Sequence, residues 1–192
     1  MSGGAALLVI FLIVSVGRTN DGVFVKIADL GAGLYHTDDL FYHPQWGGVV
    51  ANDSAPAFAG SHKGPGVFVL QNGALTRLPD PQNQLRDIDS VTANSKTVYV
   101  SDSAQGKIFR YSIRGGWVAL PVMKNFPRRP EGLFVDEDDL ITVIDESENS
   151  ITQIFPDGQT KKEYPDHPLF KAPEGIIWHP ILKTFLITDD TT

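Results

Sequence analysis

Four glycines recur at nearly equal intervals along this chain, each after a run rich in β-branched or aromatic residues. They are Gly31, Gly73, Gly115 and Gly158, and successive members lie 42, 42 and 43 residues apart. A period of this length is typical of β units that are stacked or arranged in a ring. The chain is therefore expected to be a repeat protein built of antiparallel strands.

Each unit also begins with an acidic residue and contains a strand that ends in Asn or Asp. The opening acids are Asp38, Asp89, Glu131 and Glu174, and the strand-ending residues are Asn52, Asp102, Asp145 and Asp189. Four short strands in about 40 to 45 residues match the size of a propeller blade. The sequence thus predicts an all-β fold, a β-propeller of four-stranded antiparallel blades, with about four blades' worth of chain.

The predicted propeller domain covers residues 18–192. Whole blades are expected at 38–80, 81–123 and 124–166, with part blades at 21–37 and 167–192. The first part blade would supply third and fourth strands, and the second would supply first and second strands. Two architectures fit this pattern: a four-bladed ring closed by the two ends, which leaves no exposed sheet edge, and a piece of a longer six-bladed chain.

Residues 1–17 are predicted to be a signal peptide. The run from Ala5 to Val16 is continuously apolar but too short to cross a bilayer comfortably. Ser15 and Gly17 are small residues at the positions that a cleavage site requires. We expect export to a secreted or periplasmic location, with no membrane association of the mature form.

Composition and missing motifs exclude several classes of function. The formal net charge is −7 and no segment concentrates Lys and Arg, so nucleic acid is not an expected partner. The chain has no cysteine, which excludes disulfides and thiolate chemistry. It has no phosphate-binding loop, nucleophile elbow or His-Glu-x-x-His motif, and no catalytic residue is assigned.

Two segments resemble known propeller families. The segment Pro130–Asp136, with the strand that ends at Asp145, resembles an NHL-type blade. The segment Pro173–Pro180 resembles the Glu-Gly-x-x-Trp opening of the senescence marker protein, gluconolactonase and luciferin-regenerating-enzyme-like superfamily. This resemblance implies a six-bladed propeller. It also implies either a calcium-dependent hydrolase acting on a small-molecule lactone or ester, or a noncatalytic module that binds a protein or glycan.

The resemblance implies a metal ion on the propeller axis, and Glu174 is the position that matches the family's ligand Glu. Glu131, Asp89 and Asp38 hold the same place in their blades, although no unit opens with the family's Asn-Gly. Strand starts of successive blades converge, so the repulsion among these carboxylates must be relieved by protonation or by an ion. Oxygen-only ligands favour Ca²⁺ or Mg²⁺ over Zn²⁺. The alternative is that each acid caps a turn.

The segment from Asn52 to Pro65 is the only large insertion in the repeat pattern, and such loops often carry function. Asn52 and His62 are therefore candidate binding-loop residues. The strand-ending Asn and Asp side chains are otherwise expected to bind the backbone that follows them.

Three further groups of residues receive structural interpretations. His43 and His179 each precede a proline and are interpreted as turn residues, and the three tryptophans as blade core. The Arg128-Arg129 pair is expected on a solvated loop.

Overall fold

The computed structural model describes residues 37–52, 65–72, 74–122, 126–165, 168 and 170–190. The predicted signal peptide 1–17, the part blade before Thr37 and His62 lie outside these residues. The described residues contain no helix long and apolar enough to span a membrane.

The described chain folds into three four-stranded antiparallel sheets and one two-stranded sheet. The first sheet contains β1 (Thr37–His43), β2 (Gly47–Asn52), β3 (Gly66–Gln71) and β4 (Ala74–Arg77). The second contains β5 (Ile88–Ala93), β6 (Val98–Asp102), β7 (Lys107–Ser112) and β8 (Gly116–Ala119). The third contains β9 (Pro130–Val135), β10 (Ile141–Asp145), β11 (Ser150–Ile154) and β12 (Thr160–Tyr164). The fourth contains β13 (Pro173–His179) and β14 (Thr184–Asp189).

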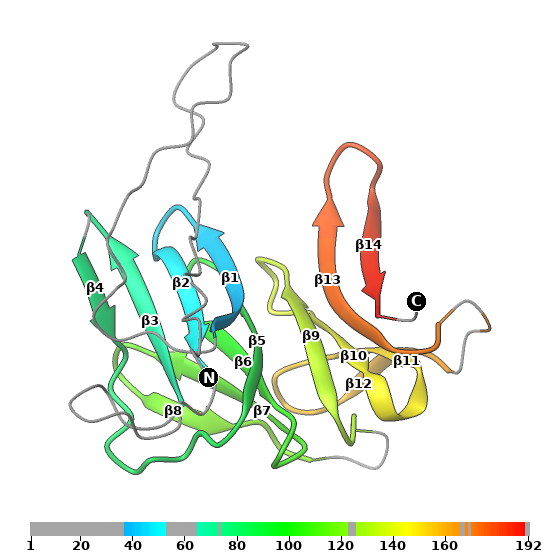
Figure 1. The fold of residues 1–192 in the computed structure, drawn as a ribbon, viewed down its shortest axis with the longest axis horizontal. Helices are drawn as coiled ribbons and strands as arrows, with labels where there is room; N and C mark the ends of the chain where they lie inside the picture. Colours follow the sequence, from blue (N-terminus) through cyan, green and yellow to red (C-terminus); the bar gives the residue numbers. More distant parts are fainter. Residues whose placement is uncertain are drawn as a thin grey trace, which may run out of the picture.

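Each strand pairs with the next one along the chain, so every sheet is a simple meander. The three complete sheets and the β13–β14 hairpin follow one another in space, as Figure 1 shows. The first strands β1, β5, β9 and β13 contact one another in that order. The predicted all-β repeat unit is confirmed, and the single short 3-10 helix η1 (Glu146–Glu148) is the only helix among the described residues.

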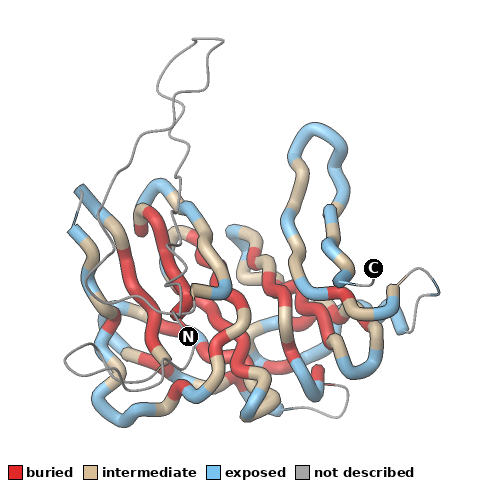
Figure 2. The backbone as a smooth tube through the Cα atoms, viewed as in Figure 1, coloured by how far each residue is buried: buried red, intermediate tan, exposed pale blue. Residues whose placement is uncertain are grey.

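The second strand of each complete sheet is buried along almost its whole length. β6 and β10 are buried at every residue, because neighbouring sheets cover both of their faces. Short continuous apolar runs, such as Val98–Val100 and Ile141–Ile144, are what a strand buried on both faces requires. Exposed residues are confined to sheet margins, turns and the last hairpin, as Figure 2 shows.

Two hydrophobic cores lie between adjacent sheets. Val98 and Val100 of β6 belong to the core shared with the first sheet, which also contains Trp46 and Trp117. Tyr99, between them in the sequence, belongs to the core shared with the third sheet. Successive side chains of a strand point to opposite faces, so one strand supplies both cores. Trp46 and Trp117 are buried as predicted, whereas Trp178 on β13 is partly exposed and stacks edge-to-face on Phe185.

The turn between third and fourth strands needs a residue with positive φ in every complete sheet. That residue is Asn72 at φ 51°, Gly116 at φ 66° and Gly158 at φ 85°. Glycine and asparagine tolerate this left-handed conformation. The glycine period in the sequence thus marks this turn, although the left-handed residue is Asn72 in the first unit and Gly116 in the second.

The strand-ending acids hold the backbone on both sides of their own strand. Asp145 Oδ1 accepts hydrogen bonds from Ser147 N at 3.0 Å and Arg129 N at 3.3 Å, and its Oδ2 accepts one from Arg128 N at 2.8 Å. Asp102 likewise accepts from Gln105 N and Arg86 N, at 3.0 and 2.7 Å. The sequence predicted only the contacts to the following backbone. The contacts to the preceding segment fix the approach to each first strand.

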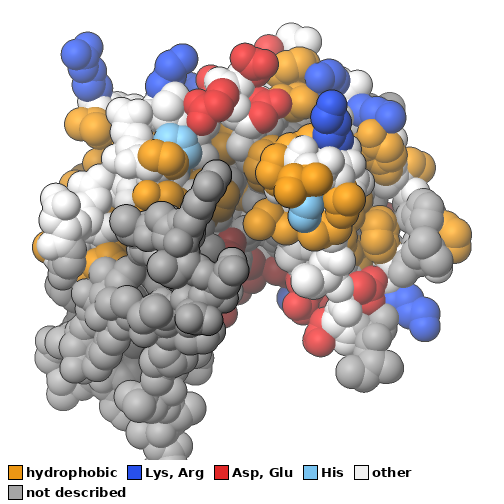
Figure 3. Space-filling model, turned by 90° about the horizontal axis from the view of Figure 1, so that it is seen from above, with side chains coloured by type: hydrophobic (Ala, Val, Ile, Leu, Met, Phe, Trp, Pro, Cys, Tyr) orange, Lys and Arg blue, Asp and Glu red, His pale blue; other side chains and the backbone are white. Residues whose placement is uncertain are grey.

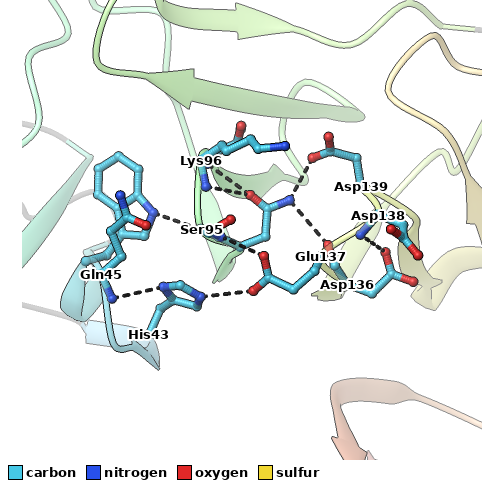
Figure 4. Close-up of polar contacts among 11 residues, drawn as sticks. His43, Gln45, Ser95, Lys96, Asp136, Glu137, Asp138 and Asp139 are labelled. Atoms are coloured by element: carbon cyan, nitrogen blue, oxygen red, sulfur yellow. Dashed lines mark hydrogen bonds and ion pairs between the residues drawn. The ribbon is translucent and has the colours of Figure 1, made fainter.

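A polar network joins the first-to-second strand turns of the three complete sheets (Figure 4). His43 Nε2 donates to Glu137 Oε1 at 3.1 Å, and Glu137 Oε2 accepts from Ser95 N at 3.2 Å. Asn94 Nδ2 donates to Asp139 Oδ1 at 2.7 Å, and the Tyr99 hydroxyl donates to the same oxygen at 2.8 Å. Burial and Asp139 together raise the pKa of Tyr99.

Both predicted turn histidines are confirmed in that role. Nδ1 of His43 accepts a hydrogen bond from Gln45 N, and Nδ1 of His179 accepts one from Leu182 N, both at 3.2 Å. Because Nδ1 of His43 accepts, its Nε2 carries the proton that is donated to Glu137.

The first strands of neighbouring sheets are joined at the third residue of each strand. Asp39 Oδ2 accepts from Ser90 Oγ at 2.7 Å and from Val91 N at 2.9 Å. Ser90 Oγ in turn accepts from Leu133 N at 3.2 Å. At the corresponding place in β9 stands Gly132, and a Cβ there would collide with the backbone carbonyl of Glu174. The close contact between β9 and β13 therefore requires glycine.

Gly132→Ala should lower the free energy of unfolding by roughly 1–3 kcal/mol, because β9 and β13 must separate to accept the methyl group. Gly48→Ala is the matched control in β2, since a Cβ at Gly48 meets its nearest neighbour, Leu70, at an ordinary 3.6 Å. Urea unfolding of both variants measures the difference. Equal stability of the two variants would show that the β9–β13 contact does not restrict residue size.

Candidate functional site

A pocket of about 460 Å³ lies where the starts of the four first strands meet. All four opening acids predicted from the sequence line it. Its lining residues are Asp38, Asp39, Asp89, Ser90, Arg129, Glu131, Glu146, Glu174, Gly175, Ile176 and Thr188. Acidic side chains are visible in the recessed centre of the face that Figure 3 shows. The pocket brings six carboxyl groups and one guanidinium together.

The repeat explains why these acids converge. Each opening acid is the first or second residue of β1, β5, β9 or β13, and these strands pack side by side. The joints made by Asp39, Ser90 and Gly132 hold neighbouring first strands together, so the preceding residue of each strand faces the same pocket. The acid spacing in the sequence thus becomes a cluster in space.

Asp89 and Glu131 form a hydrogen-bonded carboxyl pair. Burial, followed by the charge of Asp89, raises the pKa of Glu131 to about 8. The Glu131 side chain is 12 % exposed. Asp89 is held in turn by Ser103 N, which donates to its Oδ2 at 3.1 Å. Two such carboxyl groups share a proton because both cannot ionise cheaply at close range.

Glu174 and Asp38 stand at the exposed side of the pocket. Partial desolvation, followed by the charges of Asp190 and Glu146, raises the pKa of Glu174. Both residues are accessible to a ligand that enters from solvent.

Asp39 is a pocket residue that the sequence analysis did not select. Its carboxylate accepts three hydrogen bonds, from Ser90 Oγ, Val91 N and Leu40 N. Burial raises the pKa of Asp39, while these hydrogen bonds act in the opposite direction. Its doubled position, directly after Asp38, was the signal available in the sequence. The hydrogen bonds of the Asp39 carboxylate thus join the first sheet to the second.

Arg129 and Glu146 are two further pocket residues that sequence reasoning missed. Arg129 Nε lies 3.2 Å from Glu131 Oε1, and its Nη1 pairs with Glu146 Oε2. The Arg128-Arg129 pair was expected on a solvated loop, and both side chains are exposed, at 81 % for Arg128 and 55 % for Arg129. Arg128 pairs with Glu148, whereas Arg129 lines the pocket.

The candidate binding-loop residues are placed as follows. Asn52 ends β2, is 2 % exposed and pairs with Thr37 of β1 and Gly66 of β3. Its side chain is buried at the end of this strand. His62, with the rest of residues 53–64, lies outside the described residues.

No group of three or more His, Cys, Asp or Glu side chains in the described part of the chain is already arranged to hold a metal ion. The pocket carboxylates are therefore close together without forming a finished coordination shell.

The sequence matches no known protein family and no curated protein. Solved structures are similar in fold. A catalytically inactive virginiamycin B lyase from Staphylococcus aureus with quinupristin is 17 % identical, with a TM-score of 0.60 over 81 % of this chain and 49 % of that one. Regucalcin from Agrobacterium tumefaciens, described as a calcium-binding protein, is 16 % identical, with a TM-score of 0.61 over 82 % and 54 %. A chain of the nidogen–laminin complex is 14 % identical, with a TM-score of 0.59 over 80 % and 56 %.

These similarities establish the fold. The chain is an all-β propeller of four-stranded antiparallel blades, with three complete blades and half of a fourth among the described residues. It spans about half the length of these three solved structures. Six blades remain an expectation of the resemblance.

Glu131 should make the cation-free protein less stable as pH rises. Its folded pKa of about 8 exceeds the ordinary value of 4.5, so the folded state binds more protons than the unfolded state between these pH values. The stability that this proton contributes is present below about pH 4.5 and is lost toward pH 8. Melting temperature measured from pH 5 to 8.5 should fall less steeply in Glu131→Gln than in the unmodified chain.

Glu148→Gln is the control for this pH profile, because Glu148 lies outside the pocket and pairs with Arg128. It should keep the unmodified slope. Parallel profiles for all three proteins would contradict the assignment of the raised pKa to Glu131.

Proposed function

We propose that this propeller binds a divalent cation, Ca²⁺ first, in the pocket at the starts of its first strands, and hydrolyses a small-molecule lactone or ester there. The observation that carries the proposal is the meeting of Asp38, Asp89, Glu131 and Glu174 in one pocket. The calcium-binding description of regucalcin, which shares the fold, supports the choice of ion.

The donor chemistry of the pocket fits a hard cation. The lining carboxylates offer only oxygen, which Ca²⁺ and Mg²⁺ prefer. The guanidinium of Arg129 already lies between Glu131 and Glu146, so the chain itself places a positive charge there. Because no finished three-ligand group exists among the described residues, the carboxylates must draw together when the ion binds.

Glu174, Glu131, Asp89 and Asp38 are the residues that we propose as ligands. A bound cation would polarise the carbonyl group of a lactone or ester. Glu131 must lose its proton to become a ligand, so cation binding should release a proton and strengthen as pH rises toward 8. A neighbouring carboxylate of the pocket would accept the proton of the attacking water.

Calcium should raise the melting temperature of the 192-residue chain. A ligand that binds only the folded state stabilises it by about 2.7 kcal/mol at a concentration 100 times its Kd. Glu174→Gln should remove most of this effect, whereas Glu163→Gln on the exposed strand β12 should keep it. Thermal melts with EDTA and with calcium measure the shift, and hydrolysis of a lactone panel under the same two conditions tests the activity. Identical melts with and without calcium would refute the cation site.

The second candidate is a noncatalytic binding module for a protein or glycan, as the resemblance to NHL-type blades implies. The similarity to a chain of the nidogen–laminin complex favours it. An exported protein could meet either kind of partner, and we retain secretion or periplasmic export as part of both proposals.

Neutralising the pocket distinguishes the two functions. If the chain is a binding module, the quadruple variant Asp38→Asn, Asp89→Asn, Glu131→Gln and Glu174→Gln should still capture its partner, whereas deletion of residues 53–64 should abolish capture. Binding to a glycan array, and pull-down from an extracellular protein library, provide the two measurements of capture. Loss of capture in the quadruple variant, with capture intact in the loop deletion, would assign partner binding to the pocket instead.

A further inference from the structure

Arg129 is the one cationic side chain among the described residues that line the pocket. Its Nε lies 3.2 Å from Glu131 Oε1 and its Nη1 pairs with Glu146 Oε2, so one guanidinium bridges the start of β9 and the η1 turn. Both partner carboxyl groups are largely covered, with exposed side-chain fractions of 12 % for Glu131 and 24 % for Glu146. The guanidinium therefore compensates charge at the more enclosed end of the pocket.

The repeat provides an internal comparison for this residue. Arg129 precedes the opening acid Glu131 by two positions, and the corresponding residues are Asp87 before Asp89 and Ala172 before Glu174. The opening acids and the strand-ending acids or amides recur in every blade, as features of the repeat do. The arginine does not recur, so the blade fold does not require a cation at this position.

The backbone of Arg129 is held by hydrogen bonds, while its side chain is partly exposed to solvent. Its N–H donates to Asp145 Oδ1 at 3.3 Å, and its carbonyl accepts from Glu146 N at 3.2 Å. The side chain is 55 % exposed. The guanidinium can thus leave the pocket toward solvent without disturbing β9 or η1.

We infer that Arg129 is a tethered counter-cation that occupies the pocket in the absence of a ligand and competes with the divalent cation for Glu131 and Glu146. This inference rests on the proposed function, because it names the residue that regulates that same site. The positive charge of Arg129 offsets part of the negative charge of the pocket when no cation is bound. An entering cation must displace the guanidinium, and the cost of that displacement lowers the affinity for the ion.

The competition follows from charge and distance. Opposite charges in direct contact at a protein surface attract each other, although solvent exposure and salt reduce the effect. Two such contacts are lost when the guanidinium leaves, and two carboxylates become available to the ion. A pocket that lacks the guanidinium should therefore bind calcium more tightly.

The test compares calcium affinity across four proteins, each as the full 192-residue chain: unmodified, Arg129→Gln, Arg129→Lys and Arg128→Gln. Titration calorimetry with calcium chloride at pH 8 should give a Kd about tenfold lower for Arg129→Gln. Arg129→Lys retains the charge and should stay close to the unmodified chain. Arg128→Gln is the matched control, because Arg128 is adjacent but pairs with Glu148 outside the pocket. Affinity in Arg129→Gln equal to or weaker than in Arg128→Gln would overturn the inference.

A second measurement needs no added ion. With EDTA present, Arg129→Gln should melt at a lower temperature than Arg128→Gln, because Glu146 loses its counter-charge and Glu131 loses its contact with the guanidinium. If Arg129→Gln does not fold in EDTA, millimolar calcium should restore a cooperative melt, since the ion replaces the missing cation. Failure of calcium to restore folding would count against the competition.

The two measurements separate the inference from the proposed function. If the unmodified chain binds calcium and Arg129→Gln binds it no more tightly, the proposed cation site stands and the competition by Arg129 is refuted. If no variant binds calcium but Arg129→Gln melts lower than Arg128→Gln, the cation site is refuted. Arg129 is then a structural counter-charge only, and the inferred competition falls with the site.

Discussion

The joint between neighbouring first strands is the interaction on which the rest of this structure depends. Asp39 accepts hydrogen bonds from Ser90 and Val91 of the next sheet, and Ser90 accepts one from Leu133 of the sheet after it. Between β9 and β13, Gly132 takes this place, because its lack of a side chain allows the backbone carbonyl of Glu174 to approach β9 closely. These contacts bring the strand starts together, and the acidic pocket is their direct consequence.

The opposite ends of the first strands are joined by a different chemistry. There the turns of three sheets are linked by the network of His43, Glu137, Asn94 and Asp139. The side chains of this network are hydrogen-bonded to one another across the sheets. The turn end of the first strands is therefore suited to holding the sheets together. The pocket end instead holds mutually repelling carboxyl groups, among which Glu131 keeps its proton to about pH 8. The sheet-joining network and the clustered carboxyl groups thus lie at opposite ends of the same strands.

The carboxyl groups of the pocket repel one another, and other groups of the fold offset this repulsion. They do so in three ways: hydrogen bonds to the backbone at Asp39, a shared proton between Asp89 and Glu131, and the guanidinium of Arg129 beside Glu146. A ligand that supplies positive charge would replace the second and third of these. This is the physical basis for the proposal that the pocket binds a cation.

The sequence by itself determined the repeat, the strand order within a blade and the four acids that meet in the pocket, because period, turn chemistry and strand patterning are local properties. Only the tertiary structure decided the roles of Asp39, Arg129 and Glu146. Asp39 and Asp38 are adjacent acids in the sequence, yet one joins two sheets and the other faces solvent. Arg128 and Arg129 are likewise adjacent residues of the same type, but the Arg128 side chain pairs with Glu148 and the Arg129 side chain with Glu131 and Glu146. Which neighbour enters the pocket depends on how sheets pack, and packing between distant segments leaves no periodic signal in the sequence.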